Sequence, residues 1–219
     1  MADNKNIRNE RVEAARIQVA AARSADRRRS LVTWGAVAVV VLVLGAFGTK
    51  VIVDAVQGQK AVTEAAASPI EGVQVFDGLS AKHVEGIPEP VAKNGGLLPP
   101  VGGDHSADTQ TCGIYTEPVP TWNAVHSLEH GAVWVTYEPG LAADQVATLA
   151  GYATGHDHVL LSPFVDLSSP VVLSAWGLQL QVDSASDPRV QTFITKYENG
   201  PQTPEPGAPC AGVGEPSAN

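Results

Sequence analysis

The sequence predicts an α+β domain over residues 71–210, attached to a single transmembrane helix over residues 31–53. Two observations lead to this prediction. Residues 31–49 form an apolar run without a charged residue, and residues 121–200 alternate between strand-type and helix-type segments. These segments follow the order strand, helix, strand, strand, helix. That order is typical of a small mixed or antiparallel sheet covered by two helices.

The apolar run is long enough to cross a bilayer. At 1.5 Å per residue its nineteen residues extend about 28 Å, close to the roughly 30 Å hydrocarbon core. Arg27, Arg28 and Arg29 precede the run and Lys50 follows it, so the positive-inside rule places the N-terminus in the cytoplasm and the domain outside the cell membrane. A cleaved signal peptide and a buried core helix are the alternatives. The thirty-residue tail and the lack of a cleavage motif favour the anchor.

The segments around the anchor and at the C-terminus are predicted to lie outside the domain. Residues 1–30 carry a net charge of +4 and are interpreted as a solvated cytoplasmic tail. Their helix propensity leaves two alternatives, a helix on anionic lipid or a helix paired with a membrane-protein partner. Residues 54–70 are interpreted as a spacer and residues 211–219 as a flexible tail.

The part of the chain after the anchor is strongly acidic. From residue 54 onward there are 19 acidic and five basic residues, a net charge of −14 within a chain of net charge −9. Such a domain repels phosphate backbones, which excludes nucleic acid as its predicted partner. The same charge favours cations.

Local signals place the secondary-structure elements. Residues 86–108 are rich in Pro and Gly and are expected to be mostly loop. Residues 141–153 have helical apolar spacing, and a second helix is capped by Asp187, begins at Pro188 and ends at Asn199. Strands are expected at residues 73–76, 132–137, 159–162 and 170–182.

The two cysteines of the chain, Cys112 and Cys210, both follow the predicted anchor. An even number of cysteines in an oxidising compartment favours a disulfide, which would close a loop of about 100 residues. Free thiols, with Cys112 as a metal ligand, are the alternative.

The densest polar cluster is His126, Glu129 and His130, directly before a predicted strand. If residues 127–130 form one helical turn, the two histidines lie on one face at i and i+4. Neutral imidazoles there bind copper(II) or zinc, with Glu129 as a ligand or as the group that orients a ring. The alternative is a structural polar network. The inverted zinc-protease pattern H-x-x-E-H is discounted, because Gly131 is expected to end the helix after one turn.

Other side chains would complete a site. His105 is the preferred third ligand, followed by His83, whereas His156 and His158 are interpreted as parts of a solvated turn. The sole Met is Met1, so imidazole and carboxylate remain as the donors. No nucleophile motif, phosphate loop or nucleotide fingerprint is found after the anchor, which argues against an enzyme.

The run CGIYTEPVPTWNAVHSLEHGAVWVTY, residues 112–137, resembles the actinobacterial family catalogued as domain of unknown function 3105. The resemblance extends from about His83 through PPVGGDH to Cys210. It implies a secreted or membrane-anchored protein and gives the extent of the domain. It implies no activity.

We therefore expect an extracytoplasmic domain that binds a divalent metal, copper or zinc, through His126 and His130, with Glu129 and His105. The alternative function is a non-catalytic accessory or scaffold subunit of a cell-envelope membrane complex, in which the cluster is structural. An enzyme with an unrecognised reaction is the third hypothesis.

Overall fold

The computed structural model describes residues 68–87 and 98–217. The predicted cytoplasmic tail, the predicted transmembrane helix and nearly all of the predicted spacer lie outside the described residues. Within the described ranges, no helix is long and apolar enough to cross a membrane. The elements below therefore belong to the predicted α+β domain.

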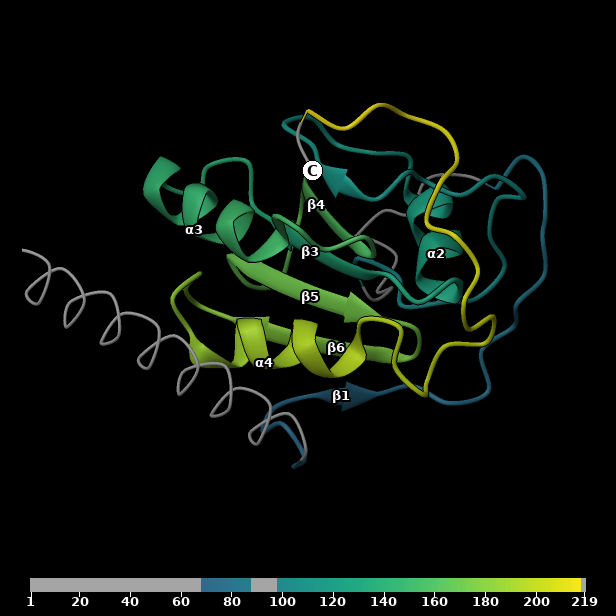
Figure 1. The fold of residues 1–219 in the computed structure, drawn as a ribbon, viewed down its shortest axis with the longest axis horizontal. Coiled ribbons are helices and arrows are strands. Elements are labelled where there is room, and N and C mark those ends of the chain that lie inside the picture. The colour runs from purple at the N-terminus through teal and green to yellow at the C-terminus, as the bar shows by residue number, and fades with distance from the viewer. Residues whose placement is uncertain (1–67, 88–97, 218–219) are drawn as a thin grey trace, which may run out of the picture. The chain divides into compact units, whose positions relative to one another are not determined.

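One mixed sheet of six strands forms the centre of the described domain (Figure 1). Its strand order is β1-β6-β5-β3-β4-β2. β4 pairs in parallel with β2 and β3, whereas the β3–β5, β5–β6 and β1–β6 pairs are antiparallel. In chain order the strands are β1 (Gln74–Val75), β2 (Gly113–Ile114), β3 (Val133–Tyr137), β4 (Val159–Pro163), β5 (Val171–Ala175) and β6 (Leu178–Val182).

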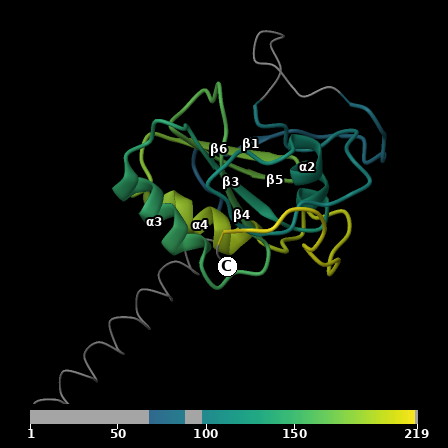
Figure 2. The same cartoon turned by 90° about the horizontal axis from the view of Figure 1, so that it is seen from above.

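Three helices in the described residues flank this sheet, α2 (Thr121–Glu129), α3 (Ala143–Ala153) and α4 (Pro188–Tyr197). α3 and α4 cover one face and α2 covers the other (Figure 2). This division follows from the two-residue period of a strand. Val133 and Val135 of β3 join the core under α3 and α4, whereas Trp134 between them joins the core under α2.

Several predicted elements are confirmed. The helix expected at residues 141–153 is α3, and the helix expected to begin at Pro188 is α4. Asp187 caps α4 as predicted, because its carboxylate accepts a hydrogen bond of 2.9 Å from the Arg189 backbone N–H. The strands expected at 73–76, 132–137 and 159–162 correspond to β1, β3 and β4.

The prediction of two helices was wrong, because α2 is a third. The sequence indicated a single turn at residues 127–130, whereas α2 begins at Thr121 and has nine residues. Pro120 at its N-cap makes no side-chain capping hydrogen bond, so the usual start signal is missing. Seven of its nine residues are buried. Tertiary packing, rather than local propensity, therefore stabilises this helix.

The single strand expected at residues 170–182 is in fact the hairpin of β5 and β6. The chain turns at Trp176 and Gly177, and Gly177 has a positive φ of 70°. A Cβ at this position would also lie 2.9 Å from the Phe76 carbonyl oxygen, so only glycine fits this turn without strain. The turn matters for the site, because Gly177 N–H donates to Val101 O at 2.7 Å and Gly177 O accepts from Phe76 N–H at 2.8 Å.

The structure joins the two cysteines that the sequence predicted to pair, with Cys112 and Cys210 linked by a disulfide. The C-terminal segment beyond α4 is thereby attached to the chain just before β2. Thr111 N–H donates to Val213 O at 2.9 Å, and Val213 N–H donates to Thr109 O at 2.8 Å. Residues 201–213 follow α4 and end at these two hydrogen bonds. They are called the strap below.

Candidate metal centre

Three histidines and one glutamate converge beside α2. One potential ligand atom from each of His83, His105, His126 and Glu129 lies within 4.8 Å of the others. His105, His126 and Glu129 are buried, with relative exposures of 0%, 5% and 3%. The His83 side chain is 44% exposed. The group thus has three buried members and one at the surface, and is called the His/Glu cluster below.

Glu129 stands at the centre of the cluster. Its Oε2 atom lies 2.9 Å from His105 Nε2, 3.5 Å from His83 Nε2 and 3.9 Å from His126 Nε2. The ligand atoms of a tetrahedral zinc with bonds of about 2.0–2.1 Å lie roughly 3.3 Å apart. The observed separations bracket that value. The three distances from Glu129 are therefore near coordination spacing, and the four ligand atoms all lie within 4.8 Å of one another.

Two loops supply His83 and His105. These residues form an isolated parallel β-bridge, in which Val84 N–H donates to His105 O at 2.8 Å and His105 N–H donates to Lys82 O at 3.0 Å. The β5–β6 turn holds the second loop through the Val101 hydrogen bond described above. The Trp176 ring of that turn also packs edge-on against His105, with ring centroids 5.8 Å apart. Backbone pairing thus places two histidines side by side although twenty-one residues separate them.

Helix α2 supplies His126 and Glu129 at positions i and i+3. Its opposite side is fixed in the core, because Val125 and Leu128 are fully buried among residues such as Trp134. Ser127 attaches the helix to the preceding loop by donating to Gln110 O at 2.6 Å and accepting from Gln110 N–H at 3.0 Å. The alternation of apolar and polar residues in α2 therefore directs its imidazole and carboxylate toward the loops.

The hydrogen bonds of His105 define what its ring offers to the cluster. Nδ1 lies 2.8 Å from Gly103 O, and since a carbonyl only accepts, Nδ1 carries the proton. In the neutral ring Nε2 is then an acceptor facing Glu129 Oε2 at 2.9 Å. Two acceptors at that distance require a proton or a metal ion between them. A backbone carbonyl that orients the distal ring nitrogen is also the usual second contact of a metal-binding histidine.

His126 is held in the neutral form that a metal ligand needs. Burial, together with the neighbouring His130, His105 and His83, lowers its pKa from 6.5 to about 4. Its ring centroid lies 4.5 Å from that of His83 and 4.9 Å from that of His105. Its Nδ1 is buried and has no hydrogen-bond partner among the described residues. Proton binding is disfavoured at this ring, so metal ions meet little competition from protons there.

His130, the fourth residue predicted for the site, lies next to the cluster but outside the four-ligand group. Its ring centroid is 4.6 Å from that of His126. Its Nδ1 donates to Pro209 O at 2.8 Å and its Nε2 lies 3.4 Å from Glu205 Oε2. His130 is the C-cap of α2, beyond the last helical residue, and its contacts are with the strap. Of the four residues predicted for the site, the structure brings together His105, His126 and Glu129. The fourth member of the group is His83 rather than His130.

His156 and His158 lie in the loop before β4 and contact the end of α4 and the strap. His156 Nδ1 lies 2.6 Å from Glu198 Oε2, and His158 Nε2 donates to Ala208 O at 3.0 Å. Glu198 also accepts from the His158 backbone N–H at 3.1 Å. These side chains contact the protein rather than solvent alone, and they lie outside the His/Glu cluster.

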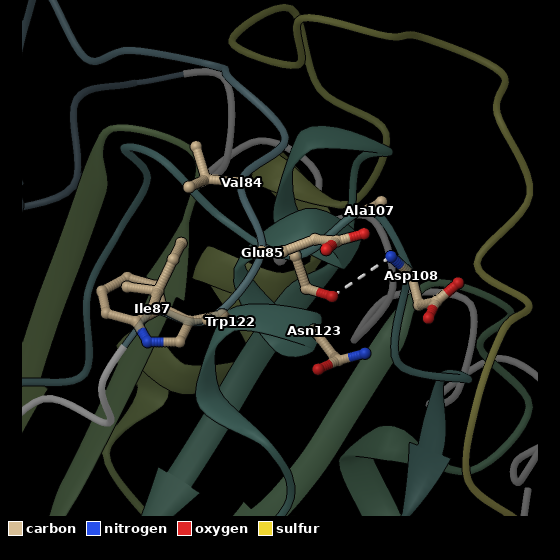
Figure 3. A pocket seen from close by; sticks show the side chains of 9 residues that line it. Val84, Glu85, Ile87, Ala107, Asp108, Trp122 and Asn123 are labelled. Atoms are coloured by element: carbon tan, nitrogen blue, oxygen red, sulfur yellow. Dashed lines mark hydrogen bonds between the residues drawn. The ribbon is translucent and has the colours of Figure 1, made fainter.

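Residues that neighbour the cluster histidines in the sequence form a cleft of about 290 Å³, whose lining is shown in Figure 3. Acidic, amide and aromatic side chains contribute to its wall, and within one lining loop Ser106 Oγ accepts from Asp108 N–H at 3.2 Å. Nine residues line the cleft, namely Val84, Glu85, Gly86, Ile87, Ser106, Ala107, Asp108, Trp122 and Asn123. Each lies within four positions of one of the three cluster histidines.

Fold and site together define a disulfide-bonded α+β domain with a buried histidine–glutamate cluster. The chain belongs to the family described as protein of unknown function (DUF3105), whose model matches residues 96–212, more than half of the 219 residues. This confirms the family resemblance. No curated protein and no solved structure matches the chain. His105, His126, Glu129 and both cysteines lie within the matched region, and His83 precedes it.

Proposed function

We propose that this domain binds one divalent transition metal ion, copper or zinc, in the His/Glu cluster. The observation that carries the proposal is the convergence of three imidazoles and one carboxylate within 4.8 Å, three of the four groups being buried. Imidazole and carboxylate are the donors that zinc and copper(II) accept in proteins. His105, His126 and Glu129 are the principal ligands, and His83 is the fourth.

The hydrogen-bonding groups of the cluster support a bound metal ion over a purely structural network. Burial and the neighbouring imidazoles lower the pKa of His126 to about 4, so positive charge is disfavoured on this ring. The hydrogen bond from His105 Nδ1 to Gly103 O leaves the Nε2 lone pair of the neutral His105 ring facing the Glu129 carboxylate. A divalent cation satisfies the carboxylate and the lone pairs together, whereas a hydrogen-bonded network needs additional protons.

The competing function is that of a non-catalytic accessory or scaffold subunit with a structural cluster. One observation favours it: Glu129 and its neighbours connect several segments through hydrogen bonds of the protein itself. Glu129 O accepts from Glu205 N–H at 3.1 Å, and His130 holds Pro209. In this alternative the cluster keeps the loops and the strap in place, and the domain binds no metal.

We also propose that the domain faces an oxidising compartment outside the cell membrane, tethered by the transmembrane helix predicted at residues 31–53. The Cys112–Cys210 disulfide supports this location, because such bonds persist outside the reducing cytosol. A membrane-impermeant biotin reagent applied to intact cells tests it. Labelling at Lys82 or Lys196 is expected, whereas labelling only after lysis would contradict the proposed topology.

Metal content tests the proposed function. The full chain, produced with its disulfide and purified in mild detergent, is dialysed with trace copper and zinc and analysed for elements. We expect about one metal ion per chain, lost in the His105→Ala/His126→Ala variant and retained in His156→Ala, which changes a histidine outside the cluster. A folded wild-type chain without metal would favour the structural alternative.

A further inference from the structure

We propose that His83 is an exchangeable ligand of this metal, and that a small neutral nitrogen donor replaces it from the adjoining cleft. This inference rests on the proposed metal-binding function and assigns a ligand class to the same site. His105, His126 and Glu129 would hold the metal throughout. The ligand that replaces His83 would be an imidazole or an amine, free or on a peptide side chain.

The four cluster residues differ sharply in burial. His105, His126 and Glu129 have exposures of 0%, 5% and 3%, so none of them can leave the metal without opening the core. The His83 side chain is 44% exposed. Displacement of His83 therefore hydrates less buried surface than displacement of any of the other three. Only this ligand can exchange with solvent at low cost.

The four residues also differ in how firmly they are held. The His105 ring is oriented by Gly103 O, and His126 and Glu129 belong to α2, whose apolar side is buried. Within the described part of the chain, the polar contact of the His83 ring is its 3.5 Å approach to Glu129 Oε2. Three of the four side chains are thus fixed by a carbonyl contact or by the helix, and the His83 ring is fixed by neither.

A metal with three protein ligands and one open position binds water or a substrate there, whereas four fixed protein ligands are typical of a structural site. With His83 displaced, the cluster would have three protein ligands and one open position. The open position would face solvent on the side that His83 now occupies. The site is then suited to accept a ligand or to pass its metal to another donor.

The cleft is formed by the same chain segments that carry the cluster residues. Asn123 and His126 lie at i and i+3 in α2, and Val84 and Ser106 directly follow His83 and His105. A cleft of about 290 Å³ is near the lower limit for small-molecule sites. It therefore admits a group of the size of an imidazole or an amino-acid side chain.

The charged side chains of the cleft determine which class of ligand it favours. Glu85 and Asp108 contribute carboxylates, Asn123 contributes an amide and Trp122 an indole, and Lys and Arg are absent from the nine lining residues (Figure 3). Carboxylates beside the open position repel anions and tolerate neutral or cationic groups. A neutral nitrogen donor with a flat or apolar body matches both the metal and this wall.

Imidazole rescue tests the inference. The full chain and its His83→Ala, His105→Ala and His156→Ala variants are loaded with copper(II) and followed by electron paramagnetic resonance during titration with imidazole. We expect His83→Ala to retain about one copper ion with affinity reduced on the order of tenfold. Millimolar imidazole should then restore the wild-type spectrum, and azide at equal concentration should bind more weakly.

The variants separate the outcomes. His105→Ala should lose copper without rescue, and His156→Ala, a histidine of similar exposure outside the cluster, should behave as wild type. If His83→Ala loses copper as fully as His105→Ala, or keeps copper without taking up imidazole, the inference is overturned and the metal-binding function stands. Tighter binding of azide than of imidazole would overturn the assigned ligand class. A wild-type chain without copper would overturn the proposed function itself.

Discussion

His105 Nε2 lies 2.9 Å from Glu129 Oε2, while Nδ1 of the same ring donates to Gly103 O. A neutral His105 therefore directs a lone pair at a carboxylate, in a place where the His105 side chain is fully buried. This relationship distinguishes a metal-binding cluster from a structural polar network. A metal ion satisfies both atoms, whereas a structural network must place a proton between them.

Glu129→Gln distinguishes these accounts. The glutamine amide can donate a hydrogen bond to His105 Nε2 but is a poor ligand for a divalent metal. We expect metal affinity to fall by at least about tenfold. The thermal unfolding midpoint in chelator should change little or rise. Isothermal titration calorimetry with zinc and thermal unfolding in chelator measure the two effects. A large loss of metal-free stability with unchanged metal affinity would contradict the metal account.

Leu128→Ala tests whether core packing positions α2 and hence the site. Leu128 is fully buried between α2 and the sheet, and its truncation leaves a cavity. We expect the free energy of unfolding to fall by about 2–5 kcal/mol. Denaturant titration followed by circular dichroism measures it. Val165→Ala, at a valine that is 57% exposed, is the control and should change stability by no more than about 0.5 kcal/mol. Equal effects at both sites would contradict the packing described for α2.

The Cys112–Cys210 disulfide should contribute strongly to stability. It closes a loop of 98 residues in sequence separation, which restricts the unfolded chain. Cys112→Ser/Cys210→Ser is expected to lower the free energy of unfolding by about 2–5 kcal/mol. A reducing agent should lower the stability of the wild type similarly and leave the variant unchanged. Indifference of the wild type to reduction would show that the strap is held by its other contacts.

The cap of α4 predicts a pH dependence of stability. The hydrogen bonds from Arg189 lower the pKa of Asp187 below its ordinary value of 3.8. A depressed carboxylate pKa stabilises the fold above the unfolded value, and the contribution is lost as pH falls through the folded pKa. Asp187→Ala should cost about 0.5–2 kcal/mol at neutral pH.

Asp187→Asn is the matched control for this cap, because asparagine still accepts the hydrogen bond from the Arg189 backbone N–H. The difference between wild type and Asp187→Ala should shrink below pH about 4, as Asp187 becomes protonated. Thermal unfolding across this pH range measures it. A difference that grows as the pH falls would contradict the assignment.

Local signals explain how much of the fold could be predicted. Asp187-Pro188 is a start signal carried by the residues themselves, and α4 begins there. The β-branched and aromatic residues from Val133 to Tyr137 likewise predict a strand, and β3 is that strand. α2 carries no such signal, because Pro120 does not cap it through a side chain and its stability comes from burial in the tertiary structure.

The candidate site could be predicted only in part for the same reason. His126 and Glu129 are close in sequence, so their proximity was visible in the HSLEHG block. The selection of His83 over His130 depends on the backbone bridge between His83 and His105, which joins two loops distant in sequence. It also depends on the strap, since Pro209 accepts the His130 hydrogen bond. Loop pairings of this kind have no periodic pattern in the sequence.

The most direct test is the position of the metal itself. Crystals of the full chain loaded with zinc, measured on either side of the zinc absorption edge, give an anomalous difference map. The account predicts one strong peak about 2 Å from nitrogen atoms of His105 and His126 and from a carboxylate oxygen of Glu129. A peak at His156 and Glu198, or none in the cluster at saturating zinc, would contradict it.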